Sequence, residues 1–255
     1  MIKKAAYNIL EAVYKNKGLP RNINGITTRL PVRYFRYFPH NYEAENFQFL
    51  KENCNPGDTV LDIGAHLGVF AVAAAKYTNG TGKVYAFEPT PVTNQLLNKT
   101  IRFNKLEKII FPRNEAVGKE IGKTRFYVSD IEGDNSNSLV SYVADRETHG
   151  EEINVVSIDS FIEQMNIKKV GFIKIDAEGA EFDVMTGAAK TLQNHRPVVI
   201  LAIHPSPILS KGDKLEDIYD FIEQLNYSIS YHGKAISKNE FCSNNKLIDL
   251  HLRPL

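Results

Sequence analysis

The 255-residue chain has almost no net charge, little cysteine and no tryptophan. Lys and Arg number 31 against 30 Asp and Glu, a formal net charge of +1. A protein that binds nucleic acid mainly through its phosphates carries a basic excess, so we do not expect nucleic acid as a partner. Cys54 and Cys242 match neither a disulfide framework nor a metal-binding spacing, which favours a reducing compartment, the cytoplasm.

Long apolar runs are also missing. A helix that spans a bilayer needs about 20 consecutive apolar residues, and no segment approaches that length. The chain begins with a basic stretch, but the apolar residues after it are interrupted by Asn8 and Glu11, unlike the core of a secretion signal. Residues 1–16 suit a short amphipathic helix, which we expect to dock on the domain or on a second copy of the chain in a homo-oligomer. Binding to a membrane surface is the alternative.

Predicted strands and helices alternate along most of the chain. Strands are expected at 59–63, 83–87, 109–113, 170–175 and 197–203, and helices at 68–77, 92–104, 180–193 and 215–225. Three short segments between 125 and 158 are typical of an antiparallel insertion, and strands at 227–231 and 247–252 close the chain. The alternation predicts an α/β fold with a doubly wound, mostly parallel sheet in residues 46–255. An N-terminal helix and an irregular cap are expected in residues 1–45.

The stretch VLDIGAHLGVFAVAAAKYTNGTGKVYAFEP, residues 60–89, places an acid at the end of each of two neighbouring predicted strands. These acids are Asp62 and Glu88. Ligands of open parallel sheets lie beyond the carboxyl ends of the strands, where the winding reverses. Gly64 and Gly68 let the backbone turn sharply and approach a ligand closely. Glu88 is placed to accept hydrogen bonds from the two hydroxyls of a ribose, which indicates a ligand that contains a nucleoside.

The spacing of these glycines separates two classes of nucleoside cofactor. A dinucleotide fingerprint reads G-x-G-x-x-G, and its glycines make room for a pyrophosphate. Here the turn reads G-x-x-x-G and follows Asp62, whose charge would repel a phosphate. The same acid suits the ammonium and sulfonium groups of S-adenosylmethionine (SAM), so we predict SAM as the cofactor. Considered without Asp62 and Glu88, the two glycines fit a turn with a purely structural role as well as they fit a cofactor site.

Four segments resemble the FkbM family of SAM-dependent methyltransferases in their order and separation: DTVLDIGAHLG, GKVYAFEPTP, FIKIDAEGAEFDVMTGAAKTL and RPVVILAIHP. The resemblance covers about residues 40–205. It implies the Rossmann-like class I methyltransferase fold and O-methylation of a hydroxyl on a saccharide or a natural-product scaffold. It also implies Asp62, Gly64, Gly68 and Glu88 as residues that bind the cofactor.

Further cofactor residues follow from the same resemblance. His66 lies in the glycine turn, where the family commonly has asparagine; its imidazole can still make a hydrogen bond, and its charge could make cofactor affinity vary near neutral pH. Asn114, Glu115 and Ala116 follow the third strand of the sheet, where class I methyltransferases contact the adenine. Glu43 matches a Tyr-Glu pair of the family and reaches the methionine part of the cofactor; the alternative is a surface acid or a salt bridge of the cap.

Three residues at the ends of the fourth and fifth predicted parallel strands are candidates for the chemistry. Asp176 ends the strand FIKI, Glu178 follows two residues later, and His204 ends the strand VVILAI. A sugar hydroxyl is a weak nucleophile, so a base or a cation that stabilises the alkoxide assists its methylation. We place Asp176 first, as the base or the ligand of a hard cation, and His204 second, as a base.

Each of these candidates has a structural alternative. Asp176 and Glu178 could cap the helix that follows them, and His204 could belong to a rigid strand exit before two prolines. Glu181 is expected to be an exposed helix acid. A divalent metal is not expected, although Asp176, Glu178 and His204 together offer oxygen and nitrogen ligands.

The sequence leaves two other functions open. An NAD(P)-dependent oxidoreductase is disfavoured by the missing third glycine of the fingerprint. A catalytically silent subunit that binds the cofactor would keep the acids at both strand ends without performing chemistry. The polar loop 129–152 either hydrogen-bonds a polyhydroxylated acceptor or connects two strands of a solvated hairpin.

Overall fold

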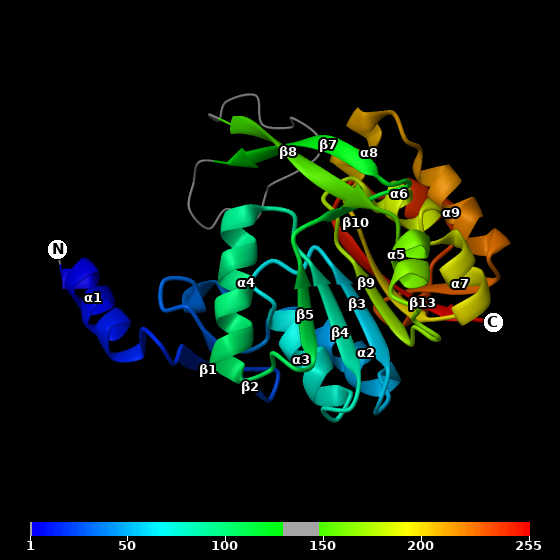
Figure 1. Cartoon of the computed structure of the whole chain (residues 1–255). Helices are drawn as coiled ribbons and strands as arrows, with labels where there is room; N and C mark the ends of the chain where they lie inside the picture. The colour runs from blue at the N-terminus through cyan, green and yellow to red at the C-terminus, as the bar shows by residue number, and fades with distance from the viewer. Residues whose placement is uncertain (1, 130–147) are drawn as a thin grey trace.

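Eight strands form a central sheet in the order β12-β11-β13-β10-β9-β3-β4-β5 in the computed structural model of the chain (Figure 1). The structure describes residues 2–129 and 148–255. The parallel strands are β3 (Thr59–Ile63), β4 (Lys83–Phe87), β5 (Ile110–Arg113), β9 (Phe172–Ile175) and β10 (Val198–Ile203). Because β3 lies between β4 and β9, the winding reverses there, and the carboxyl ends of these strands meet in one crevice.

Antiparallel strands lie at one edge of the central sheet and in a separate small sheet. Strand β13 (Ile248–Pro254) pairs antiparallel with both β10 and β11 (Tyr227–Tyr231), and β12 (Lys234–Ala235) closes that edge. A separate three-stranded sheet contains β6 (Ala116–Val117), β8 (Thr148–Val156) and β7 (Gly122–Ser129). It corresponds to the predicted antiparallel insertion. The strand predicted at 138–143 and residues 130–147 of the polar loop lie outside the described residues.

Successive residues of the central strands pack into two apolar layers on opposite faces of the sheet. Val60 and Val84 belong to one cluster and Leu61 and Tyr85 to the other. The first layer is covered by α2 (Ala44–Asn53), α3 (Val69–Tyr77) and α4 (Pro91–Asn104), and the second by α5 (Ile158–Gln164), α6 (Glu181–Thr186), α7 (Ala189–His195), α8 (Pro205–Lys211), α9 (Leu215–Gln224) and α10 (Lys238–Cys242). The predicted doubly wound, mostly parallel α/β sheet is therefore confirmed.

The segment expected to be irregular contains a β-hairpin. Strands β1 (Leu19–Ile23) and β2 (Ile26–Leu30) pair across a two-residue turn, Asn24-Gly25, in which both residues have positive φ. This dipeptide is the sequence signal of a type I′ turn, so the hairpin was predictable. Ile23 and Leu30 are buried in the same cluster as α3, which ties the N-terminal segment to the core of the sheet.

The helix expected at 180–193 is two helices, α6 and α7. At Gly187, between them, an added Cβ would lie 2.1 Å from the carbonyl oxygen of Gly118, so the backbones of two segments touch there. The Asp159 carboxylate accepts hydrogen bonds from the backbone N–H groups of Lys190 and Thr191 at the start of α7. This contact satisfies donors that a helix leaves free at its N-terminus, and a new helix can begin there.

Helix α1 (Ile2–Tyr14) extends to one side of the sheet, beyond the hairpin (Figure 1). Its residues Ile9 and Val13 are exposed, so the expected docking of the helix on the domain does not involve these two side chains. Within residues 2–129 and 148–255, the helices are too short or too polar to cross a membrane.

Candidate active site

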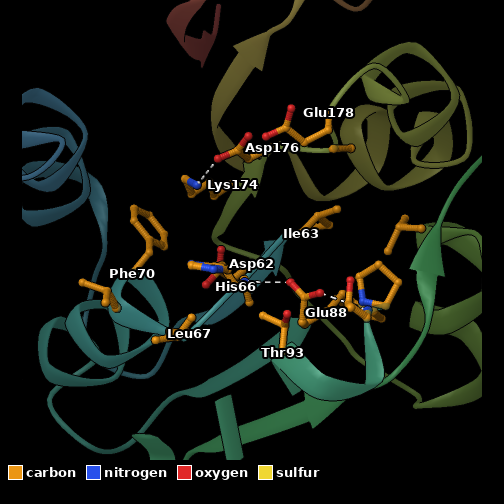
Figure 2. A pocket seen from close by; sticks show the side chains of 18 of the residues that line it. Asp62, Ile63, His66, Leu67, Phe70, Glu88, Thr93, Lys174, Asp176 and Glu178 are labelled. Atoms are coloured by element: carbon orange, nitrogen blue, oxygen red, sulfur yellow. Dashed lines mark hydrogen bonds and ion pairs between the residues drawn. The ribbon is translucent and has the colours of Figure 1, made fainter. Parts of the chain in front are cut away.

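A cavity of about 360 Å³ opens at the carboxyl ends of β3, β4, β9 and β10, where the winding reverses (Figure 2). Ten of the candidate residues from the sequence line it: Glu43, Asp62, Gly64, His66, Glu88, Glu115, Ala116, Asp176, Glu178 and His204. Gly68 and Asn114 are not among its lining residues. The topology thus brings together side chains from segments more than a hundred residues apart.

Gly64 and Gly68 shape the turn between β3 and α3 for packing reasons that the sequence did not reveal. Gly64 has a φ of 78°, and an added Cβ would lie 1.9 Å from the carbonyl oxygen of Asp176. Gly68, the N-cap of α3, has a φ of 81°, and its added Cβ would lie 2.4 Å from Leu97 Cδ1. Glycine adopts such backbone angles without strain. At Gly64 a side chain would also collide with backbone, whereas at Gly68 the side chain of Leu97 would have to shift.

Glu88 is held by backbone N–H groups at the end of β4. Its Oε2 accepts a hydrogen bond from His66 N and its Oε1 from Thr90 N, each at 3.0 Å. Burial nevertheless raises the pKa of this carboxyl to about 7. A carboxylate oxygen can accept more than one hydrogen bond, so the oriented group can also receive donors from a ligand in the cavity.

Asp62 is fully buried, and neither of its carboxylate oxygens has a hydrogen-bond partner among the described residues. Burial raises the pKa of Asp62 to about 7, although the nearby Lys174 acts in the opposite direction. A buried polar group without a partner is costly. Since Asp62 lines the cavity, a ligand that donates hydrogen bonds and carries positive charge would satisfy it. This is the chemistry of the amino group of SAM.

Lys174 is a site residue that the sequence analysis missed. It lies in β9 directly opposite Asp62 of β3, and it is 4% exposed. Its Nζ lies 2.8 Å from Asp176 Oδ2 and 3.9 Å from Glu43 Oε2. Burial alone would lower the pKa of Lys174, but the surrounding carboxylates hold it well above its usual value. A lysine in the otherwise apolar strand FIKI was the available signal.

The N-terminal segment supplies one wall of the cavity. Phe38 and Tyr42 line it beside Glu43. Their rings meet edge to face, with centroids 5.0 Å apart. The backbone of Glu43 is in the left-handed region, with a φ of 44°. Its carboxylate pairs with Lys174 at 3.9 Å, so the salt bridge of the cap that was the alternative for Glu43 is present, at the wall of the cavity.

His66 does not behave as the sequence suggested. Its ring is packed near the ring of Phe38, with centroids 6.1 Å apart, and burial lowers the pKa of its imidazole to about 4. The side chain is therefore neutral at pH 7. The expectation that its charge makes cofactor affinity vary near neutral pH is wrong, because protonation of the buried ring is too costly in that range.

Asn114 has a structural task instead of a place on the cavity wall. Its side-chain amide donates hydrogen bonds to the carbonyl oxygens of Glu88 and Pro89, at 3.0 and 2.8 Å. These bonds connect the loop after β5 to the end of β4. The next two residues, Glu115 and Ala116, do line the cavity, and the Glu115 carboxylate is paired with Arg113 at 2.8 Å.

Asp176, Glu178 and His204 lie together at one side of the cavity, where Figure 2 shows Asp176 beside both Lys174 and Glu178. His204 Nε2 lies 3.7 Å from Asp176 Oδ1 and 3.5 Å from Glu178 Oε2. Neither acid caps the following helix α6: its N-cap is Ala180, without a side-chain cap. His204 does precede a helix, α8, but its imidazole faces the two acids rather than the solvent.

Glu181 is the fourth member of this group, and the expectation that it is an exposed helix acid is wrong. It is completely buried, and its Oε1 lies 2.8 Å from His204 Nδ1. Burial alone would lower the pKa of His204, but the hydrogen bond and charge of Glu181, together with Glu178 and Asp176, raise it to about 9. Three carboxylates around one imidazole therefore create a strong demand for positive charge.

Comparison with known proteins assigns the chain to a protein family. The family model described as "Methyltransferase FkbM domain" matches residues 62–229, more than half of the chain. The chain belongs to the FkbM methyltransferase family. This confirms the resemblance seen in the sequence. It also removes the support for an NAD(P)-dependent oxidoreductase.

Individual proteins are similar to the chain in sequence or in fold. The chain is similar to the hexuronic acid methyltransferase AglP of Haloferax volcanii, with 26% identity over 163 residues, which cover 64% of this chain and 62% of AglP. The match thus spans less than two thirds of that relative. Methyltransferase FkbM from Methylobacillus flagellatus has a similar fold, with a TM-score of 0.53 at 17% identity over 87% of this chain and 54% of that one. A putative methyltransferase from Streptococcus mutans, in complex with S-adenosylhomocysteine (SAH), has a TM-score of 0.50 at 9% identity. The match covers 84% of this chain and 97% of that one.

Proposed function

We propose that the chain is a SAM-dependent O-methyltransferase that methylates a hydroxyl of a saccharide. The observation that carries the cofactor assignment is the buried, unpartnered carboxylate of Asp62 on the wall of a cavity at the strand ends. A cation that donates hydrogen bonds suits it, and a pyrophosphate does not. The saccharide acceptor is supported by the likeness to a hexuronic acid methyltransferase.

The cavity residues divide into groups that suit the parts of SAM. Glu88 would accept hydrogen bonds from the ribose hydroxyls, since its carboxylate is already oriented by two backbone N–H groups. Asp62 would hold the amino group. Lys174 and Glu43 lie beside Asp62 and would position the rest of the methionine part. Glu115 and Ala116 would contact the adenine. In this proposal, residues 1–45 form a cap that closes the methionine side through Phe38, Tyr42 and Glu43.

The chemistry requires alignment more than it requires covalent help from the protein. A lone pair of the acceptor oxygen forms a bond to the methyl carbon, and the electron pair of the carbon–sulfur bond returns to sulfur. The products are a methyl ether and SAH, and the hydroxyl proton must leave the acceptor. The group formed by Asp176, Glu178 and His204 lies in the same cavity and would either take that proton or stabilise the developing alkoxide.

The test is an incubation with SAM carrying an isotopically labelled methyl group and a panel of uronic and neutral saccharides. The proposal predicts a labelled saccharide and an equal amount of SAH, both detected by mass spectrometry. Asp176→Asn should abolish transfer and retain SAH binding. If the wild type binds SAH but labels none of these saccharides, the saccharide assignment is overturned. If transfer is as fast in Asp176→Asn, the assignment of the reacting group is wrong.

A further inference from the structure

The three side chains at the reactive side of the cavity have the spacing of ligands around one cation. One atom each from Asp176, Glu178 and His204 can be chosen so that all three lie within 4.8 Å of one another. A metal ion at about 2.0–2.2 Å from oxygen and nitrogen ligands separates those ligands by about 3–4.4 Å. The distances from His204 Nε2, 3.5 and 3.7 Å, fall in this range. They exceed the ~2.7–2.9 Å of a charge-assisted hydrogen bond.

The buried carboxylate of Glu181 prepares the histidine for such a role. It lies 2.8 Å from Nδ1 of His204, and both of its oxygens also accept a hydrogen bond from Gly179 N, at 3.1 and 3.0 Å. A histidine that binds a metal typically donates its other ring N–H to a carboxylate, which fixes the tautomer and the ring orientation. Here that arrangement aims Nε2 at Asp176 and Glu178.

The backbone around Glu178 is also shaped to present its side chain at this position. Glu178 has a φ of 49°, in the left-handed region that is unfavourable for residues other than glycine. Gly179 follows with a φ of 104°, and a Cβ there would lie 2.7 Å from Pro207 Cβ. The turn therefore requires glycine at 179 and strained backbone at 178. Such strain is concentrated at functional sites.

The two carboxylate oxygens of Asp176 face different residues. Oδ2 is 2.8 Å from Lys174 Nζ, while Oδ1 is the atom that faces His204. Lys174 thus orients the carboxylate without occupying the oxygen that faces the other two ligands. With Glu178 and Glu181, three carboxylates meet here. A divalent cation that replaces the proton on Nε2 of His204 would add to the positive charge that Lys174 supplies.

We propose that Asp176, Glu178 and His204 bind one divalent cation, which holds the acceptor oxygen next to the methyl group of the cofactor. Two carboxylates and one imidazole suit Mn²⁺, which accepts both oxygen and nitrogen ligands, better than Mg²⁺ or Ca²⁺, which prefer oxygen. This assignment rests on the proposed methyltransferase function and replaces the expectation that no metal takes part.

The cation would explain how a weakly acidic hydroxyl reacts without a free base. The acceptor oxygen binds the cation and its proton leaves to water, because the cation stabilises the alkoxide that remains. The oxygen then forms its bond to the methyl carbon as the carbon–sulfur bond breaks. The cation is neither oxidised nor reduced and is retained by its three protein ligands.

The test is a titration of the full chain, first treated with a chelator, with MnCl₂, in which electron paramagnetic resonance measures free Mn²⁺. The proposal predicts one bound Mn²⁺ per chain. His204→Ala, Asp176→Asn and Glu178→Gln should each weaken its binding by about a hundredfold or more, and Glu181→Gln by about ten- to a hundredfold. Asp183→Asn is the matched control, since this acid of the same helix pairs with Lys211 instead, and its Mn²⁺ binding should be unchanged.

A parallel calorimetric titration with SAH separates this inference from the proposed function. A protein that binds SAH but no Mn²⁺ overturns the cation site and leaves the SAM assignment intact. Mn²⁺ binding that survives all the ligand variants also overturns the site. If SAH does not bind, the proposed function fails, whatever Mn²⁺ does. Glu178→Gln, the substitution of the most exposed of the three ligands, guards against a variant that fails to fold.

Discussion

The buried ammonium of Lys174 lies 2.8 Å from Asp176 Oδ2, two residues farther along the chain. It also lies opposite Asp62 in the sheet and 3.9 Å from Glu43. One cation is therefore shared by the carboxylates of both halves of the cavity, the cofactor side and the reactive side. This relationship explains how several acids can face one enclosed space in a folded chain.

We expect Lys174→Met to destabilise the fold by about 3–5 kcal/mol, because it leaves buried carboxylates without their counter-charge. Chemical denaturation at neutral pH measures this loss. The matched control is Lys211→Met, which breaks ion pairs with Asp183 and Asp213 near the surface and should cost about 1 kcal/mol or less. An equal loss in the two variants would show that Lys174 does not hold the site together.

Asp62→Asn separates stability from ligand binding. Asp62 is buried without a hydrogen-bond partner in the described part of the chain. Its negative charge therefore destabilises the ligand-free fold, and a bound cationic ligand would offset that cost. We expect the ligand-free variant to unfold at a higher temperature than the wild type at about pH 8. We also expect SAH to bind about tenfold more weakly or worse. Thermal unfolding and calorimetry measure the two effects. A variant that loses stability yet binds SAH normally would show that Asp62 is purely structural.

The affinity for SAH should rise with pH. The pKa values of Asp62 and Glu88 are both raised to about 7 by burial, so each carboxyl is partly protonated at neutral pH. The ligand's ammonium favours the ionised form of Asp62, so binding should release protons and strengthen from about pH 6 to about pH 8. Calorimetry in buffers with different ionisation enthalpies counts the released protons. Affinity that is flat over this range would contradict the account.

The raised pKa of Asp62 also predicts how the effect of Asp62→Asn on stability depends on pH. A folded-state pKa above the ordinary value of 3.8 means that the folded protein binds the Asp62 proton more tightly than the unfolded chain does. The wild type therefore loses stability through Asp62 as pH rises from about 4 to about 7. The advantage of the variant should be small near pH 4 and reach its maximum above pH 7. Unfolding free energies measured across this range check the sign.

Gly64→Ala should prevent stable folding, whereas Gly212→Ala should not. Both glycines have positive φ, but a Cβ at Gly64 would collide with the carbonyl oxygen of Asp176, while a Cβ at Gly212 would meet no atom within 4 Å. The left-handed backbone alone costs an alanine roughly 1–2 kcal/mol, so Gly212→Ala isolates that component. Soluble yield and circular dichroism compare the two variants. Similar stability in both would show that the turn after β3 can relax away from β9.

The parts of the site that local sequence encodes could be predicted from the sequence. Asp62, Gly64 and Glu88 follow from a strand, a turn and the next strand, within thirty residues. Lys174 and Glu181 were missed because their roles depend on the register between β9 and β3 and on the packing of α6 against β10, which distant segments set. Asn114 was predicted to contact the adenine because it follows the third parallel strand of the sheet. In the structure its side-chain amide donates hydrogen bonds to the carbonyl oxygens of Glu88 and Pro89 instead.

The cofactor assignment is tested by calorimetric titration of the purified chain with SAH, with NAD as the competing ligand and with the Glu88→Ala variant in parallel. We expect the wild type to bind SAH with a micromolar Kd and not to bind NAD. Glu88→Ala should lose most of the SAH affinity, because it removes the carboxylate that His66 N and Thr90 N orient at the end of β4. A wild-type chain that is folded and does not bind SAH would contradict the account.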